Sequence, residues 1–257
     1  MAGSSKMATS GGYSHVLLDG GNLIAGPLGE TLDHMMAFLQ EHRLPDPQHV
    51  MSFLRGDVRP RRDHQLSRFE RESKAAQDFA QMLRFLLPLN NNMPTRYLLA
   101  ETTSPEWLVL VDNHARARVD RALTAYLTKV LRTRAIGWNC REHTLRQRDG
   151  ELIGHPGGSN FYTQEDGSLV RSIDCVYEGT WRFAQFGTPY DFEHVSRYKS
   201  PKKRGRLTCE MVKEYLAAFA VSPWEEGFYR VTAEHPAQGV RFVSEDPSVN
   251  AWLDPTQ

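Results

Sequence analysis

The sequence has few cysteines, no net charge and no long apolar run. Cys140, Cys175 and Cys209 are far apart and odd in number, which does not suit a disulfide framework and predicts reduced thiols. No stretch approaches the roughly 18 apolar residues that a membrane helix needs, and the small, polar start of the chain lacks a signal-peptide core. We therefore expect a cytoplasmic protein with no membrane partner.

The charge balance excludes electrostatic steering by the molecule as a whole. Lys and Arg together number 31, as do Asp and Glu, so attraction to nucleic acid has to come from a local patch. The 257 residues are 40% hydrophobic and 24% charged, which is typical of a globular protein. We expect residues 1–12 to form a flexible tail and residues 13–257 one domain, with any subdivision near 90–94.

Apolar periodicity predicts helices, and β-rich runs between turn residues predict strands. The helices are expected over 26–42, 61–88, 119–134 and 206–221, with Thr208 as an N-cap and a further helix start at the capping-box pattern of Ser222 and Glu225. Strands are expected over 49–56, 96–101, 106–112, 136–142, 159–164, 169–177 and 180–186, with edge strands over 228–231 and 239–244.

Acidic residues followed by Gly, at Asp166-Gly167 and Glu178-Gly179, are typical of tight hairpin turns. These features predict an α+β fold with a mostly antiparallel sheet of hairpins and a meander, and amphipathic helices packed on one face. Strands do not alternate regularly with helices, which disfavours a doubly wound parallel sheet.

Asp19 follows an apolar run in SHVLLDGGNLIAG. The favoured interpretation is a hairpin turn through Asp-Gly-Gly-Asn. Alternatively, the stretch loosely resembles, over about six residues, the first strand of PIN-like nucleases, and this implies that an Asp at the strand end binds a divalent metal. A hard cation needs several oxygen ligands, and Asp112 is the natural partner. The metal hypothesis requires the two carboxylates to lie within a few ångströms of each other.

Cys140 and His143 form a C-x-x-H pair, but a structural zinc needs four ligands and no second pair is present. We therefore expect no metal and no cofactor. Cys209 is predicted in the first turn of a helix, whose dipole would stabilise a thiolate; a nucleophile there is the less favoured interpretation.

Six cations gather within ten residues near the end of the chain. They are Arg197, Lys199, Lys202, Lys203, Arg204 and Arg206. The segment is interpreted first as a solvated loop before a helix. Nucleic acid and an acidic protein partner are the alternatives, because Ser-Pro-Lys-Lys and Arg-Gly-Arg resemble fragments of minor-groove DNA-binding tails.

Trp181 belongs to the densest aromatic group of the chain, which is interpreted first as core packing. If one face of its strand is exposed, Trp181 and Arg182 point to opposite sides. Arg171, Arg182 and Glu193 could then line a polar groove on the sheet. With Trp181, these residues are the candidate binding surface.

The order of features over roughly residues 95–230 resembles a family of uncharacterised bacterial proteins. The resemblance is carried by Arg171, Ser172, Ile173, Glu178, Gly179, Trp181, Phe183, Phe192, Glu193, Tyr198, Arg206 and Thr208. The chain departs from the pattern at Asn113-His114, where an Asn-Gly step is expected. The resemblance implies one continuous α+β unit and brings no established activity with it.

The sequence shows no complete group of catalytic residues. We therefore expect a bacterial binding or interaction protein without catalytic activity, an immunity-type or regulatory partner of another protein. The first alternative is a metal-dependent nuclease or other hydrolase that uses Asp19 and Asp112. The second is a DNA-binding accessory protein that acts through the basic loop 197–206.

Overall fold

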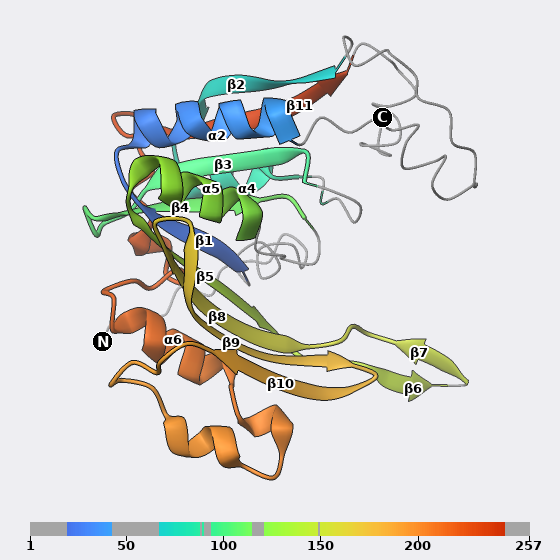
Figure 1. Cartoon of the computed structure of the whole chain (residues 1–257). Helices are drawn as coiled ribbons and strands as arrows, with labels where there is room; N and C mark the ends of the chain where they lie inside the picture. The colour runs from blue at the N-terminus through green and yellow to red at the C-terminus, as the bar shows by residue number, and fades with distance from the viewer. Residues whose placement is uncertain are drawn as a thin grey trace, which may run out of the picture.

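The computed structural model describes residues 20–42, 67–87, 89, 94–114, 121–148 and 150–244. Within these residues, nine strands form one antiparallel sheet in the order β10-β9-β8-β5-β1-β4-β3-β11-β2, shown in Figure 1. Strands from both sides of residues 90–94 belong to this sheet. No helix in the described part of the chain is both long enough and apolar enough to span a bilayer.

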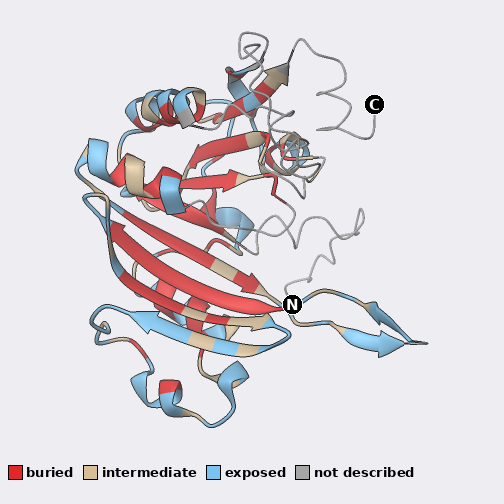
Figure 2. Ribbon diagram, turned by 45° about the vertical axis from the view of Figure 1, so that its right-hand side comes forward, coloured by how far each residue is buried: buried red, intermediate tan, exposed pale blue. Residues whose placement is uncertain are grey.

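Hairpins join β3 to β4, β8 to β9 and β9 to β10, whereas the other neighbouring strands are farther apart in the chain. Their bounds are β1 Gly20–Ala25, β2 Ser67–Ala76, β3 Arg96–Glu101, β4 Trp107–Asp112, β5 Arg134–Arg141, β8 Gly158–Glu165, β9 Ser168–Glu178, β10 Thr180–Phe186 and β11 Ala237–Ser244. A separate two-stranded hairpin, β6 (Arg146–Arg148) with β7 (Glu151–Ile153), projects from the body in both overall views (Figures 1 and 2).

Four α-helices cover the sheet within the described residues: α2 (Leu28–His42), α4 (Phe79–Phe85), α5 (Arg121–Leu131) and α6 (Cys209–Ala217). The short 3₁₀ helices η2 (Val195–Lys199), η3 (Lys203–Gly205) and η4 (Glu226–Phe228) lie in the connections. The predicted α+β class with a large antiparallel sheet is confirmed.

The helices are divided between the two faces instead of gathering on one. Adjacent residues of a strand point to opposite faces: the Tyr162 hydroxyl lies 3.1 Å from Thr124 Oγ1 of α5, whereas the Phe161 ring packs against Tyr215 of α6. Each face has its own hydrophobic core, one beneath α2 and α5 and one beneath α4 and α6. The central strands are therefore apolar on both sides, as Leu23 and Ile24 illustrate.

The hairpin of β3 and β4, the meander β8-β9-β10 and helices α2, α5 and α6 agree with the sequence predictions. The helix predicted over 61–88 is wrong, because residues 67–76 form β2 and, of the described part of this range, only 79–85 are α-helical. The Phe69 ring packs edge-on against Phe242 of β11, so pairing with a distant strand overrides the helical periodicity.

Three further predictions are corrected. Gly20, Gly21 and Asn22 lie inside β1 instead of in a turn; a Cβ on Gly21 would come 2.8 Å from the Trp138 ring, so close packing requires this glycine. Strand β11 lies between β3 and β2 and is not an edge. No α-helix starts at Ser222, where the chain turns before η4.

Candidate binding site at the Trp181 depression

A depression of about 410 Å³ opens where β10, the ends of β5 and β8, the loop before α6 and the α6 N-terminus meet. We call it the Trp181 depression. It is lined by Arg141, Glu142, His143, Gly158, Ser159, Trp181, Arg204, Leu207, Thr208, Cys209 and Glu210. Two of the residues predicted separately, Trp181 and Arg204, are thus brought together.

Aromatic and cationic side chains pack around Trp181. The Arg204 guanidinium carbon lies 5.7 Å from the centroid of the Trp181 ring system, within the range of a cation–π contact. The His143 ring lies 5.4 Å from Trp181 and 4.4 Å from Tyr177. His143 Nδ1 accepts the N–H of Gly157 at 3.2 Å, which holds the ring in place.

The basic loop, residues 197–206, is attached to the sheet at several points. The Arg206 guanidinium carbon lies 5.4 Å from the Phe183 ring centroid, and its Nε donates to the Ser200 carbonyl at 2.7 Å. The buried Cys175 thiol donates to the Lys203 carbonyl at 3.1 Å. The backbone is therefore fixed, and the exposed cations project from a defined surface.

Arg197, Lys199, Lys202, Lys203 and Arg204 are exposed. Among the described residues, no carboxylate forms an ion pair with any of these five. The ten residues of the basic loop include no Asp or Glu. The interpretation as a cationic surface therefore has a geometric basis that the sequence alone did not give.

Arg171 and Glu193 meet inside the protein. Their side chains are completely buried, and Arg171 donates from Nε and Nη2 to the two Glu193 carboxylate oxygens at 2.9 and 2.6 Å. Its other N–H groups donate to Gln185 Oε1 and to the carbonyls of Phe186 and Gly187. All five guanidinium N–H groups thus have acceptors.

This network continues into the core of α6. Glu193 also accepts from the Tyr198 hydroxyl at 2.8 Å, which lies 2.9 Å from the Tyr215 hydroxyl. Burial raises the pKa of Tyr198, as do these two hydrogen bonds. Burial acts to lower the pKa of Arg171, but the hydrogen bond and charge of Glu193 outweigh it and leave the pKa above its ordinary value.

The prediction that Arg171, Arg182 and Glu193 line one exposed groove is therefore wrong. The ion pair holds the segment that enters the basic loop and does not face solvent. Arg182 is exposed and pairs with Glu178 at 3.2 Å, on the opposite face of β10 from Trp181. Of the predicted binding set, only Trp181 lies at the depression.

The prediction of three reduced thiols is wrong for two of them. Cys140 of β5 and Cys209 of α6 form a disulfide across a separation of 69 residues. Their strand and helix meet only in the tertiary structure, so spacing in the sequence gave no sign of the pair. Cys140 is therefore not available as a zinc ligand with His143.

Asp112 lies at the end of β4, where its carboxylate accepts the N–H of His114 at 2.8 Å. Asp19 lies outside the described residues, so the proximity of the two carboxylates stays a prediction. Among the described residues, no three His, Cys, Asp or Glu side chains are grouped to hold a metal ion.

A second polar cluster, which the sequence did not suggest, lies on the α5 face of β8 and β9. Asp174 accepts from Ser172 Oγ at 2.8 Å and Arg121 Nη2 at 3.0 Å, and also from Asn160 Nδ2. Since the neighbouring side chains already use the Asp174 carboxylate, we interpret this cluster as structural. Alternation of polar with apolar residues over Ser172-Ile173-Asp174-Cys175 of β9 was the available signal.

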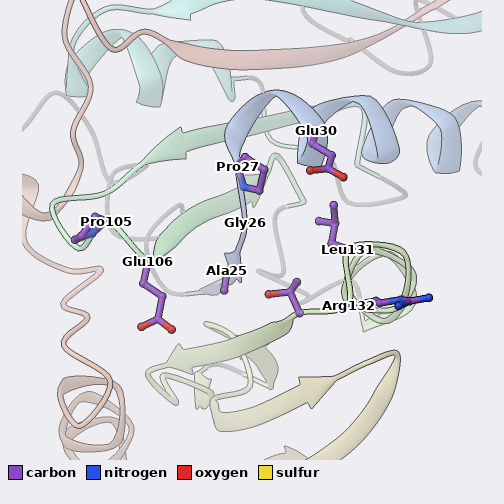
Figure 3. Close-up of a pocket in the computed structure, with 9 residues that line it drawn as sticks. Ala25, Gly26, Pro27, Glu30, Pro105, Glu106, Leu131 and Arg132 are labelled. Carbon is purple, nitrogen blue, oxygen red and sulfur yellow. The ribbon is translucent and has the colours of Figure 1, made fainter.

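Another depression, of about 430 Å³, lies between the start of α2 and the end of α5. Figure 3 shows Glu30 and Glu106 at opposite ends of it and Arg132 pointing to the side. Glu106 is also paired with Arg134. The polar side chains of this depression do not point toward one another.

Comparison with known proteins gives no match. No protein-family model, no curated protein and no solved structure matches this chain. The resemblance to an uncharacterised bacterial family therefore stays a prediction. A proposal about function has to come from the chemistry of the site.

Proposed function

We propose that this chain is a binding protein without catalytic activity, and that it takes an acidic, extended segment of another protein along the outer edge of β10. The observation that carries the proposal is the position of this open edge beside the basic loop and the Trp181 depression. An immunity-type or regulatory role in the bacterial cytoplasm is the biological setting we propose for it.

The two edges of the sheet differ in how they are protected. Natural proteins blunt edge strands with charges and irregular backbone. Strand β2 carries an Arg68–Glu70 pair and an Arg71–Asp33 pair, and Lys74 has a left-handed φ of 60°. Strand β10 has one charged residue, Arg182, and is mostly exposed, as Figure 2 shows. Within the described residues, nothing pairs with its outer edge.

An open edge directs every second N–H and C=O away from the sheet, and a polypeptide in extended conformation can use them. The exposed cations of the basic loop select for acidic side chains in such a segment and raise the rate of encounter. Trp181 and Arg204 supply the aromatic and guanidinium groups that dominate binding energy at protein interfaces.

The lining of the Trp181 depression favours a polypeptide over a nucleic acid. Arg141 and Arg204 are matched there by Glu142 and Glu210. A phosphate backbone carries only negative charge and cannot pair with Glu142 or Glu210, whereas an acidic polypeptide segment can also include a Lys or Arg at those positions. A nucleic acid also lacks the regularly spaced backbone N–H and C=O groups that pair with an open strand edge.

The test is selection from a random-peptide display library on the folded protein. We expect enrichment of sequences rich in Asp or Glu and in β-forming residues, and loss of the enrichment on Lys202→Glu/Lys203→Glu. The matched control, Arg84→Glu/Lys129→Glu, makes the same change of charge at exposed positions of α4 and α5 and should retain it. Equal selection by both variants would refute the proposal.

Hydrogen exchange locates the contact. With the selected peptide bound, amide exchange should slow in residues 180–186 and stay unchanged at the opposite edge, residues 67–76. Oligothymidylate is the competing probe. Binding of it with a steep salt dependence, together with no peptide selection, would replace this proposal by the DNA-binding accessory role.

A further inference from the structure

The disulfide between Cys140 and Cys209 joins the end of β5 to the first residue of α6, with the two Cα atoms 5.3 Å apart. This separation lies within the range that a disulfide spans without movement of the backbone. Thr208 Oγ1 caps the same turn by accepting the N–H of Met211 at 3.3 Å.

The two sulfurs have different surroundings. Cys140 is 6% exposed and lies among buried side chains. Cys209 is half-buried and lines the Trp181 depression, with its Sγ 3.7 Å from Ser159 Oγ. A thiol reagent that enters the depression therefore reaches Cys209 first.

We propose that Cys140–Cys209 is a reversible thiol–disulfide exchange site, and that an external thiol opens it by attack on the Cys209 sulfur. The incoming thiolate forms a bond to Cys209 Sγ. The Cys140–Cys209 bond breaks, and its electron pair leaves with Cys140, which takes up a proton. The product is a mixed disulfide on Cys209.

A dithiol reductant completes the exchange. Its second thiol, as the thiolate, attacks the reductant sulfur that is bound to Cys209 and closes the reductant's own disulfide. Cys209 leaves as a thiolate in the first turn of α6, where the helix dipole stabilises it. The protein disulfide gains two electrons and the one proton that Cys140 carries, the dithiol is oxidised to its own disulfide, and the other proton that it loses goes to solvent.

Opening the bond changes the Trp181 depression, because it frees the α6 N-terminus from β5. Cys175 takes no part in the exchange. It is completely buried, its thiol donates to the Lys203 carbonyl, and burial raises the pKa of its thiol. The test of the exchange does not depend on the proposed peptide binding, because it measures the chemical state of Cys140 and Cys209 directly.

The first test uses the wild-type protein purified without reductant. Exposure to glutathione, quenching with acid and peptide mass mapping should place the glutathione on Cys209 and leave Cys140 as a free thiol. After treatment with dithiothreitol both cysteines should be free, and oxidised dithiothreitol should restore the bond. Glutathione on Cys140, or a protein in which the bond does not form, would overturn the proposal.

The second test compares the remaining thiol in two folded variants. In Cys140→Ser, Cys209 should react with iodoacetamide at least about tenfold faster than Cys140 does in Cys209→Ser. Equal rates or the reverse order would contradict attack at Cys209. Unreacted Cys175 in the same samples verifies that the core stays closed, and the wild-type mapping decides the question if either variant does not fold.

Discussion

Arg171 and Glu193 form a completely buried ion pair, with 2.6 Å between Arg171 Nη2 and Glu193 Oε2. Burying two charges is costly unless every polar atom is satisfied, and here the guanidinium also donates to the carbonyls of Phe186, the last residue of β10, and of Gly187. The pair therefore fixes the segment between β10 and the basic loop. Arg171 and Glu193 were predicted to contact a partner directly. Instead, they position the basic loop, which we propose contacts the partner.

Replacing Arg171 with Ala should destabilise the protein by about 3–5 kcal/mol, because Glu193 would keep a buried charge without its partner. Urea unfolding measures the change. Arg182→Ala is the control: its ion pair with Glu178 is exposed and should contribute less than about 1 kcal/mol. A similar loss in both variants would contradict the structural role of the buried pair.

Gly137→Ala should destabilise the fold by about 1–3 kcal/mol. A Cβ at this position would overlap the ring of Tyr162, which is completely buried and cannot move aside. Gly205→Ala is matched to it, since a Cβ at Gly205 has open space around it. Thermal unfolding of the two variants distinguishes the positions, and an unchanged melting temperature for Gly137→Ala would rule out this packing.

Tyr162→Phe should cost about 1–3 kcal/mol, the usual penalty for leaving a buried polar group without a partner. The Tyr162 hydroxyl donates to Asn22 Oδ1 at 2.6 Å and lies 3.1 Å from Thr124 Oγ1. Tyr126→Phe removes a hydroxyl from a half-buried ring of α5 and serves as the control in chemical denaturation. Equal stabilities would show that the Tyr162 hydrogen bonds contribute nothing net.

Glu210 should make the stability of the folded protein decrease as the pH falls into the acid range. Its own backbone N–H and the Thr208 side chain hold the pKa of the Glu210 carboxyl below the ordinary 4.5. A carboxyl with a lowered folded-state pKa stabilises the protein above its ordinary pKa and loses that contribution as the pH falls. Melting temperatures of Glu210→Gln and wild type should therefore differ at neutral pH and converge at strongly acid pH; a constant difference would contradict the assignment.

Local sequence patterns were sufficient where one element buries one face. In α5, Leu123 and Leu127 recur four residues apart and are completely buried, so the periodicity predicted the helix. The meander followed from Asp166 and Gly167, whose positive φ values form the turn between β8 and β9. The same patterns failed at residues 67–76, where Phe69 pairs with β11 from far along the chain.

The candidate site could be predicted only in pieces. Trp181 and the basic loop stood out by residue type, but nothing local indicated that Arg204 stacks on Trp181. The predicted polar groove was wrong because the charge of Arg171 and Glu193 does not show whether these side chains are buried or exposed. Arg171 and Glu193 attract each other strongly inside the protein, where little water screens their charges.

The sequence by itself determined the α+β class, the hairpins of the meander, the capped start of α6 and the concentration of cations in residues 197–206. Each depends on interactions between residues close in the chain. Only the tertiary structure decided that Cys140 meets Cys209, that Arg171 and Glu193 are buried together, and that β10 is the open edge. These depend on which distant strands pair, and strand pairing is set by packing across the whole sheet.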